Sequence, residues 1–317
     1  MGATTIASRD LEAQKRGSSM GLLSRIPAKV QNHFVAAMAE FMGTFLFLFF
    51  AFAGTQTANA PRSITGDENT DIPQGPDPLV LLYISTCFGV SLTATVWIFF
   101  RISGGVFNPA VTIGLCLGGA VPIIRGIVVI PAQIIGGIVA SLVVKYLFPG
   151  PLAVTTTLSL PTTPVQGMFI EMMLTAQLVF TIYMLAVEKH RATFLAPLGI
   201  GLSLFTAELA GVYYTGGSLN PARSFGPCVA NSDYPESHWI YWVGPILGAI
   251  FATGFYKLLK LMSYERVNPG QDGEGATFAL LDDDFHTRSS SHALALNQSF
   301  GRPLSIPESL IDRRSVV

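Results

Sequence analysis

The chain has 317 residues, of which half are apolar and only 12% are charged, with a mean hydropathy of +0.48 and a formal net charge of −1. Soluble domains carry about 25% charged residues, so this composition excludes an ordinary water-soluble domain and indicates a chain embedded in a lipid bilayer. The near-neutral charge argues against nucleic acid as a partner, and three cysteines give no even disulfide framework.

Residues 1–33 are mostly polar and carry both signs of charge. They contain no short apolar core followed by a small-residue cleavage site, so we predict no removable signal peptide. We therefore expect residues 1–33 to form a cytoplasmic segment and the first apolar run to insert directly into the bilayer.

Six apolar runs follow that are long enough to cross a bilayer as helices, which takes about 20 residues each. They cover residues 34–54, 79–100, 122–147, 166–187, 194–213 and 239–261. An Asn-Pro-Ala stretch comes after the second run and another after the fifth, and each leaves only about ten apolar residues, or ~15 Å of helix. Because the hydrocarbon core is about 30 Å thick, these stretches predict half-helices that enter the membrane without crossing it.

The two Asn-Pro-Ala stretches belong to an internal repeat whose offset is the separation of Asn108 from Asn220. The same repeat offset relates Gly89 to Gly201. Asn is a preferred N-cap and Pro is favoured at the first helical position. Each stretch therefore predicts a loop that ends by starting a short helix.

Each repeat, about residues 34–150 and 166–262, holds three crossings and one half-helix. An odd number of crossings inverts the second copy, so we expect the N-termini of the half-helices to meet near the midplane. Irregular backbone at that depth is tolerated only where it is buried or lines a watery cavity, and inverted repeats with broken helices mark permeation paths. We therefore predict an all-α membrane protein with six transmembrane helices plus two re-entrant half-helices in an inverted repeat, forming a channel domain of residues 34–262.

The charges of the loops predict the orientation. The loops on the side of the basic N-terminal segment carry most of the Lys and Arg, whereas the loops of the other side are acidic or uncharged. The positive-inside rule then places both termini in the cytoplasm. Residues 263–317 mix charge with Ser, Gly and Asp without a sustained period, so we expect a largely disordered cytoplasmic tail.

These features resemble the aquaporin, or major intrinsic protein, family over residues 34–261. The resemblance rests on two motifs inside six apolar spans, Asn108-Pro109-Ala110 and Asn220-Pro221-Ala222. It is supported by Glu40 and Glu171, each of which lies in an apolar span and is followed four residues later by Thr. The Gly-Gly-Val-Phe sequence before the first motif and the long tails are most similar to fungal members.

The resemblance implies a channel and not an enzyme, and the sequence offers no clustered His and Cys ligands, no nucleophile with a base and no phosphate loop. It also implies no cofactor, no metal, and a homotetramer with one pore per subunit. The expected partners are water, small neutral solutes and the lipid bilayer, with no nucleic acid. We expect a multi-pass protein of the plasma membrane.

The motifs also predict how the pore works. An Asn N-cap uses its side-chain oxygen to accept from its own helix, which leaves the amide nitrogens of Asn108 and Asn220 to donate to a passing oxygen. The half-helix dipoles place about half a positive charge at each N-terminus, which hinders cations and proton relay. In the family, the residues equivalent to Glu40 and Glu171 accept hydrogen bonds from the pore-loop amides. The backbone carbonyls of the loops should form an acceptor ladder, which comprises Gly104, Gly105, Val106, Gly216, Gly217 and Ser218.

The repeat breaks at Arg223, which the offset pairs with Val111, and this lone arginine resembles the family's selectivity-filter arginine. The family's other filter positions fall on Phe88, Glu208 and Gly217. Typical water channels have His at the Glu208 position, so this chain departs from the pattern there. Three roles stay open for Glu208: it pairs with Arg223, it is protonated and acts as a neutral donor, or it turns from the pore and holds loop backbone.

The resemblance favours water over glycerol as the permeant. Glycerol channels usually carry Asp directly after the filter arginine, where this chain has Ser224, and Pro-Leu where it has Tyr241-Trp242. The two aromatic residues are equally consistent with an interfacial belt. Hydrogen peroxide, which mimics water in size and polarity, is a further candidate permeant. The alternatives are a facilitator of glycerol or other small neutral solutes and, third, a proton-coupled transporter that uses Glu208.

Overall fold

A computed structural model describes residues 26–60 and 77–268. Most of the predicted N-terminal segment and nearly all of the predicted tail lie outside these residues. The described residues contain helices and loops and no strand. The predicted fold class is confirmed, since six helices are long and apolar enough to cross a membrane.

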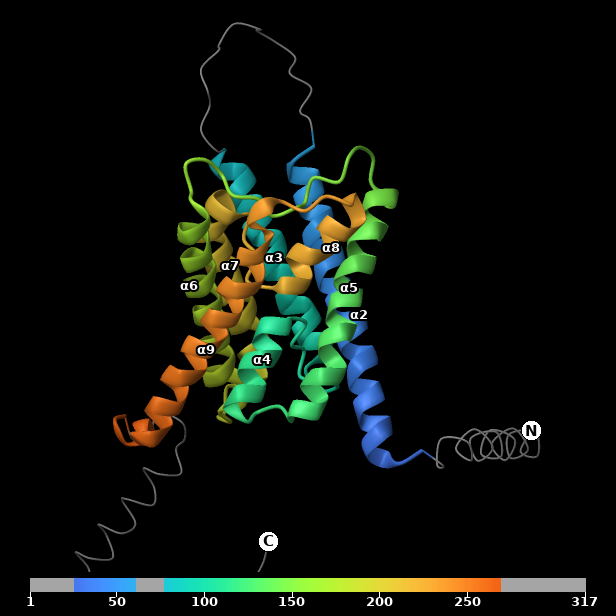
Figure 1. Cartoon of the computed structure of the whole chain (residues 1–317). Coiled ribbons are helices and arrows are strands. Elements are labelled where there is room, and N and C mark those ends of the chain that lie inside the picture. Colours follow the sequence, from blue (N-terminus) through green and yellow to red (C-terminus); the bar gives the residue numbers. More distant parts are fainter. Residues whose placement is uncertain (1–25, 61–76, 269–317) are drawn as a thin grey trace, which may run out of the picture. The chain divides into compact units, whose positions relative to one another are not determined.

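The six long helices fall where the apolar runs predict them (Figure 1). The first helix differs most, because it begins at Ala28, before the predicted start at residue 34. The sixth predicted run begins in the short 3₁₀ helix η3 (Glu236–Trp239), and the fourth ends in a single π-helical turn, η1 (Tyr183–Val187). The long helices are α2 (Ala28–Ala58), α3 (Pro78–Phe99), α5 (Ile123–Leu147), α6 (Pro164–Ile182), α7 (Ala196–Thr215) and α9 (Ile240–Leu261).

Two short helices lie among the long ones, α4 (Pro109–Gly118) with 10 residues and α8 (Pro221–Asn231) with 11. Each begins as the sequence predicts, with an Asn N-cap and a Pro at the first helical position. In Figure 1, α4 lies in the lower half of the bundle and α8 in the upper half, and both start near the middle. Neither is long enough to cross the bilayer.

Small residues allow the helices of each repeat to pack closely. A Cβ on Gly136 of α5 would come within 2.7 Å of the Phe41 carbonyl oxygen in α2. A Cβ on Gly248 of α9, the counterpart of Gly136 at the repeat offset, would overlap the Met172 carbonyl oxygen in α6. No hydrophobic driving force holds helices together in lipid, so they associate through close van der Waals packing. Glycine at these crossings lets the two backbones approach closely enough for it. The pair α2 and α5 in the first half of the bundle and the pair α6 and α9 in the second half therefore pack in the same way.

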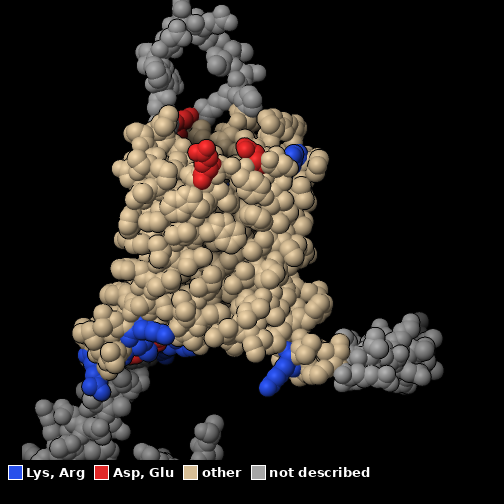
Figure 2. All heavy atoms as spheres, viewed as in Figure 1, with Lys and Arg blue, Asp and Glu red and all other residues tan. Residues whose placement is uncertain are grey.

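Charged side chains gather at the two ends of the bundle and leave an uncharged belt between them (Figure 2). Lys and Arg dominate the lower end, where α2 begins and α9 ends, and acidic side chains dominate the upper end. Many large apolar side chains of the long helices are exposed, for example Trp97, Ile127 and Phe251. An apolar surface of this kind is matched to lipid rather than to water.

Candidate functional site

The two loops that precede the half-helices have the same backbone conformation. Gly105 and Gly217 have φ of 66° and 60°, and the residues before each asparagine, Phe107 and Leu219, have φ of 52° and 53°. A positive φ is unfavourable for Phe and Leu, so the surrounding contacts must hold these residues in place. Both side chains are completely buried. The internal repeat of the sequence is therefore also a repeat of backbone geometry.

Glu40 and Glu171 hold the two loops in corresponding ways. The carboxylate of Glu40 accepts from the backbone N–H groups of Val106 at 3.1 Å and Phe107 at 2.7 Å. That of Glu171 accepts from Ser218 at 2.9 Å and Leu219 at 2.7 Å. A buried carboxylate requires several donors, and each loop supplies two.

Each glutamate has a third donor that the sequence reasoning missed. Gln133 Nε2 donates to Glu40 at 2.8 Å and also to Thr112 Oγ1 at 2.9 Å. Thr215 Oγ1 donates to Glu171 at 2.6 Å. The one available signal for Gln133 was a polar amide inside the apolar run 122–147, because polar groups in membrane spans need partners.

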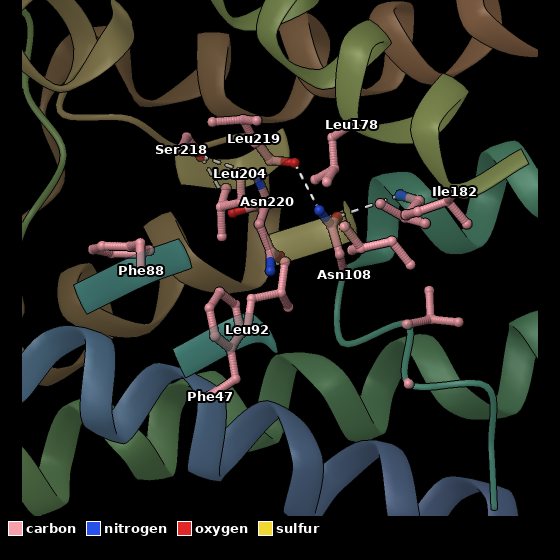
Figure 3. A pocket seen from close by; sticks show the side chains of 14 residues that line it. Phe47, Phe88, Leu92, Asn108, Leu178, Ile182, Leu204, Ser218, Leu219 and Asn220 are labelled. Carbon is pink, nitrogen blue, oxygen red and sulfur yellow. Dashed lines mark hydrogen bonds between the residues drawn. The ribbon is translucent and has the colours of Figure 1, made fainter. Parts of the chain in front are cut away.

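The asparagine side chains cap their own helices and also tie the two loops together. Asn108 Oδ1 accepts from Ala110 N at 2.9 Å, and Asn220 Oδ1 accepts from Ala222 N at 3.0 Å. Asn108 Nδ2 donates to the Leu219 carbonyl at 2.8 Å (Figure 3). Asn220 Nδ2 donates to the Phe107 carbonyl at 2.9 Å.

The sequence reasoning did not foresee that each asparagine amide also bonds the opposite loop. Each NH₂ group has two N–H donors, and one of them is used to bond the opposite loop. One donor per asparagine is left, so the two residues together offer two donors at the centre of the molecule.

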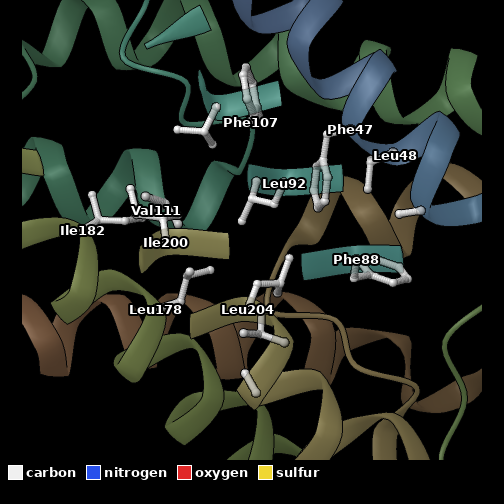
Figure 4. Packing of buried hydrophobic residues seen from close by; sticks show 14 of the residues in the cluster. Phe47, Leu48, Phe88, Leu92, Phe107, Val111, Leu178, Ile182, Ile200 and Leu204 are labelled. Carbon is white, nitrogen blue, oxygen red and sulfur yellow. The ribbon is translucent and has the colours of Figure 1, made fainter. Parts of the chain in front are cut away.

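A small cavity lies where the two half-helices meet. Water-sized molecules have about 20 Å³ of free volume in it, and both asparagines line it. A buried water needs at least about 10–15 Å³ by this measure, so the cavity suits about one water. Its remaining wall is largely apolar and comes from several helices, for example Phe47, Leu92 and Leu204 (Figure 4).

Larger cavities open on each side of this central cavity. The α4-side vestibule has about 340 Å³ and shares five lining residues with the central cavity, namely Gly105, Val106, Val111, Ile182 and Ile200. The α8-side vestibule has about 250 Å³, and Val154, Gly216 and Arg223 are among its lining residues. The α4-side vestibule therefore adjoins the central cavity, and the α8-side vestibule is lined by Arg223, which lies against Phe88 of the central cavity.

Arg223 lies beside Phe88, at the α8 side of the central cavity. Its guanidinium carbon is 4.9 Å from the centre of the Phe88 ring and 5.4 Å from that of Phe52. The guanidinium donates to three backbone carbonyls, those of Gly217 at 2.9 Å, Val154 at 2.7 Å and Gly216 at 3.2 Å.

Two carbonyls of the predicted acceptor ladder are therefore already bonded by Arg223, those of Gly216 and Gly217. Of the other ladder residues, Gly104, Gly105 and Val106 line the α4-side vestibule and Ser218 lines the central cavity.

Glu208 is completely buried, and neither carboxylate oxygen has a hydrogen-bond partner among the described residues. Its carboxylate lies against Gly217, where an added Cβ would overlap Oε2. It is hydrogen-bonded neither to Arg223 nor to loop backbone, and it does not line any of the three cavities. The glycine at position 217 thus provides the space that the Glu208 side chain fills.

The interfacial-belt interpretation is wrong for Tyr241. Its side chain is completely buried, and its hydroxyl donates to the Thr215 carbonyl at 2.8 Å. Tyr241 therefore supports the end of α7 where the second pore loop begins. Trp242 is partly exposed and donates to His238 Nε2 at 3.2 Å.

The fold and the paired loops define a channel of the kind built from two inverted half-membrane helices. The sequence profile of the major intrinsic protein family matches residues 28–256. The chain therefore belongs to the major intrinsic protein family, whose members are membrane channels and not enzymes.

Relatives and a solved structure agree with this assignment. Aquaporin-7 of Botryotinia fuckeliana is 56% identical over 276 residues, which are 87% of this chain and 60% of that protein. Aquaporin-5 of the same fungus is 60% identical over 77% of this chain and 45% of its own length. Probable aquaporin-3 of Gibberella zeae is 48% identical over 81% of this chain and 93% of its own length. This chain thus spans only about half the length of the first two relatives.

The X-ray structure of the aquaglyceroporin from Plasmodium falciparum has the same fold. It superposes with a TM-score of 0.60 at 20% identity and covers 72% of this chain and 99% of its own. At this identity the similarity establishes the fold alone.

Proposed function

We propose that this chain is a passive water channel that excludes protons and other cations. The observation that carries the proposal is the central cavity, which suits about one water and places the donors of Asn108 and Asn220 beside it. A water that accepts from both donors turns its own hydrogens away from the centre, which interrupts a proton relay. Hydrogen peroxide, which has similar size and polarity, is the second permeant that we expect.

Two features support the exclusion of cations. The half-helices α4 and α8 point their N-termini at the centre, and each contributes about half a positive charge there. Arg223 adds a full charge on the α8 side, beside Phe88. We expect the Phe88 ring and the Arg223 guanidinium, which lie 4.9 Å apart, to narrow the pore on this side and so to favour water over glycerol.

We further propose that the end rich in Lys and Arg faces the cytoplasm, with both termini on that side, and that the protein is a homotetramer of the plasma membrane. The charge distribution of Figure 2 supports the orientation through the positive-inside rule.

Lys145 is a cation at the opposite, mainly acidic end, and a neighbouring helix explains why it lies there. It donates to the Ala230 carbonyl at 2.6 Å, near the C-terminus of α8, where the helix dipole favours a cation.

Flux measurements on purified protein in liposomes test the proposal. Stopped-flow light scattering would give the permeability to water and to glycerol, and a pH-sensitive dye inside the vesicles would report proton flux. We expect water permeability well above that of bare lipid, with glycerol and proton permeability at the lipid level. Glycerol movement as fast as water would establish a glycerol facilitator instead, and proton flux coupled to a solute gradient would establish a transporter.

A further inference from the structure

The α4-side vestibule is basic. Arg125 and Lys189 both line it, together with the hydroxyl-bearing Ser103. None of the described residues that line it is Asp or Glu. A concave site with two cations and no acid concentrates anions, since field lines are focused in a cavity with apolar walls.

Arg125 has an unused donor in this region. It lies in the first turn of α5, and its Nε is buried without a hydrogen-bond partner among the described residues. A buried donor without a partner costs about 1–3 kcal/mol, more when it is charged. A phosphate-type oxyanion matches a guanidinium well, because it accepts two parallel hydrogen bonds from it. Because Nε is buried, such a ligand would bond to the two terminal nitrogens of the guanidinium, which form no hydrogen bond with a described residue.

Lys189 contributes a second cation that no described acid neutralises. Its Nζ donates to the Ala186 carbonyl, and two further N–H donors remain on the ammonium group. The neighbouring acid, Glu188, is bonded to other groups: it accepts from the Tyr256 hydroxyl at 2.6 Å and lies 3.2 Å from Lys260 Nζ. The charge of Glu188 is thus held against α9.

The start of α5 adds to the positive potential of the vestibule. Pro122, its N-cap, lines the cavity and provides no side-chain cap for the first amides. Open amides and the positive end of a helix dipole favour an anion, and they act here in addition to the two side-chain charges.

We propose that the α4-side vestibule binds a phosphate-type anion and that the bound anion closes the water path. Water that leaves the central cavity on this side enters the vestibule that Arg125 and Lys189 line, because the two cavities adjoin through five shared lining residues. The anion is either a free phosphate compound or the phosphate of a lipid headgroup, and both present the same oxygens to Arg125 and Lys189. The closing step rests on the proposed water conduction, whereas anion binding does not.

Binding is tested first, without any flux. Equilibrium dialysis of radiolabelled inorganic triphosphate against the purified full chain in detergent would give its affinity. We expect Arg125→Gln and Lys189→Gln each to weaken binding about tenfold, the value of one charge-assisted hydrogen bond. Arg125→Lys keeps the charge but not the paired donors, so it should weaken binding less than Arg125→Gln. Lys257→Gln is the matched control, because Lys257 is exposed on α9 and does not line the vestibule.

Flux is tested next, in phosphatidylcholine vesicles with triphosphate or, at equal ionic strength, chloride on both sides. Triphosphate at its dissociation constant should about halve the protein-dependent water permeability, since half of the sites are then occupied. Arg125→Gln should remove most of this inhibition, and Lys257→Gln should retain it. A third set of vesicles contains phosphatidic acid and no soluble triphosphate. Inhibition there that depends on Arg125 identifies the lipid headgroup as a source.

The outcomes separate the two proposals. No saturable binding, or equal losses in Arg125→Gln and Lys257→Gln, would overturn the anion site. Binding that leaves water permeability unchanged would overturn the closing step. A protein that binds triphosphate but conducts no water in chloride would sink the proposed function and leave the anion site standing.

Discussion

The two pore loops have nearly the same backbone conformation, but the side chains that line them differ: those of the first loop are apolar, and those of the second are charged. At the repeat offset, Val96 and Val111 of the first half correspond to Glu208 and Arg223 of the second. All four side chains are buried. The first loop is thus lined by two apolar side chains at the positions where the second has an acid and a base.

The comparison separates what builds the loops from what makes them selective. The residues that shape the backbone occur in both copies: paired glycines, an asparagine N-cap and a glutamate that accepts from two amides. The acid and base that line the loop, Glu208 and Arg223, occur in the second copy alone. We infer that the duplicated framework can hold either chemistry and that discrimination among permeants is concentrated on the α8 side.

The largest effect is expected for Arg223→Val, which gives the second loop the side chain of the first. A fixed charge about 4 Å from a passing cation opposes it by about 4 kcal/mol at an effective dielectric constant of about 20. Its removal should therefore raise proton and potassium leak by roughly two to three orders of magnitude. Leak into vesicles, measured with a pH dye and a potassium-selective electrode, checks this.

Arg223→Lys and Val111→Leu are the controls for that experiment. Lysine keeps the charge but cannot donate to all three carbonyls in the geometry of the guanidinium, so leak should stay low while stability falls. Val111→Leu changes the first loop without changing charge and should leave leak at the wild-type level. If leak in Arg223→Val equals that of the wild type, Arg223 is not a charge barrier.

The next largest effect is a loss of stability, which should be greater for Gly217→Ala than for Gly105→Ala. Both glycines have a positive φ, which costs an L-residue about 1–2 kcal/mol. A Cβ on Gly105 would lie 3.3 Å from Val96, whereas one on Gly217 would overlap the Glu208 carboxylate. We expect Gly217→Ala to cost about 3 kcal/mol in total and Gly105→Ala about half of that.

Thermal unfolding in detergent compares these variants, and a second substitution tests the cause. Glu208→Ala should recover much of the loss in the Gly217→Ala background, because it removes the atoms that collide. The coupling free energy of such a contacting pair is typically about 0.5–3 kcal/mol. An additive double variant would mean that Glu208 and Gly217 do not constrain each other.

The sequence predicted the helices and the asparagines of the two loops better than it predicted the hydrogen bonds and contacts between distant residues. The apolar runs, the repeat offset and the Asn-Pro starts are local or periodic signals, and they located the six spans, both half-helices and the paired asparagines. The early start of α2 at Ala28 was missed because hydropathy marks the part of a helix in lipid and not its end. Residues 29–33, which are polar apart from Val30, continue the helix beyond that part.

The missed contacts join residues far apart in the chain. Gln133 lies 93 residues from Glu40, and the Val154 carbonyl lies 69 residues from Arg223. No spacing or cap pattern links such partners, and a backbone carbonyl carries no sequence signature at all. The orientation of Glu208 toward Gly217 depends in the same way on how α7 packs against the second loop.

An intermediate effect is expected for the two supporting glutamates. Glutamine at position 40 or 171 has one acceptor oxygen where the carboxylate has two, so a loop amide loses its partner. Each variant should lose about 2 kcal/mol of stability, the cost of an unsatisfied buried donor. Glu171→Gln should also raise proton leak more than Glu40→Gln, because its loop carries Arg223 in addition to one of the two asparagines. Equal leak in the two variants, measured with the pH dye, would contradict the inference that selectivity is concentrated on one side.

The smallest effect lies where the half-helices end. Both C-terminal caps are left-handed: Gly119 after α4 has φ of 84°, and Ser232 after α8 has φ of 55°. Glycine adopts this conformation without a Cβ penalty, so Ser232→Gly should stabilise the protein by about 0.5–1 kcal/mol and Gly119→Ser should destabilise it similarly. A side chain at position 119 would meet nothing within 4 Å, so its cost is that of backbone strain alone. Thermal unfolding should show shifts of opposite sign with water permeability unchanged, and shifts of the same sign would show that the two ends are not equivalent caps.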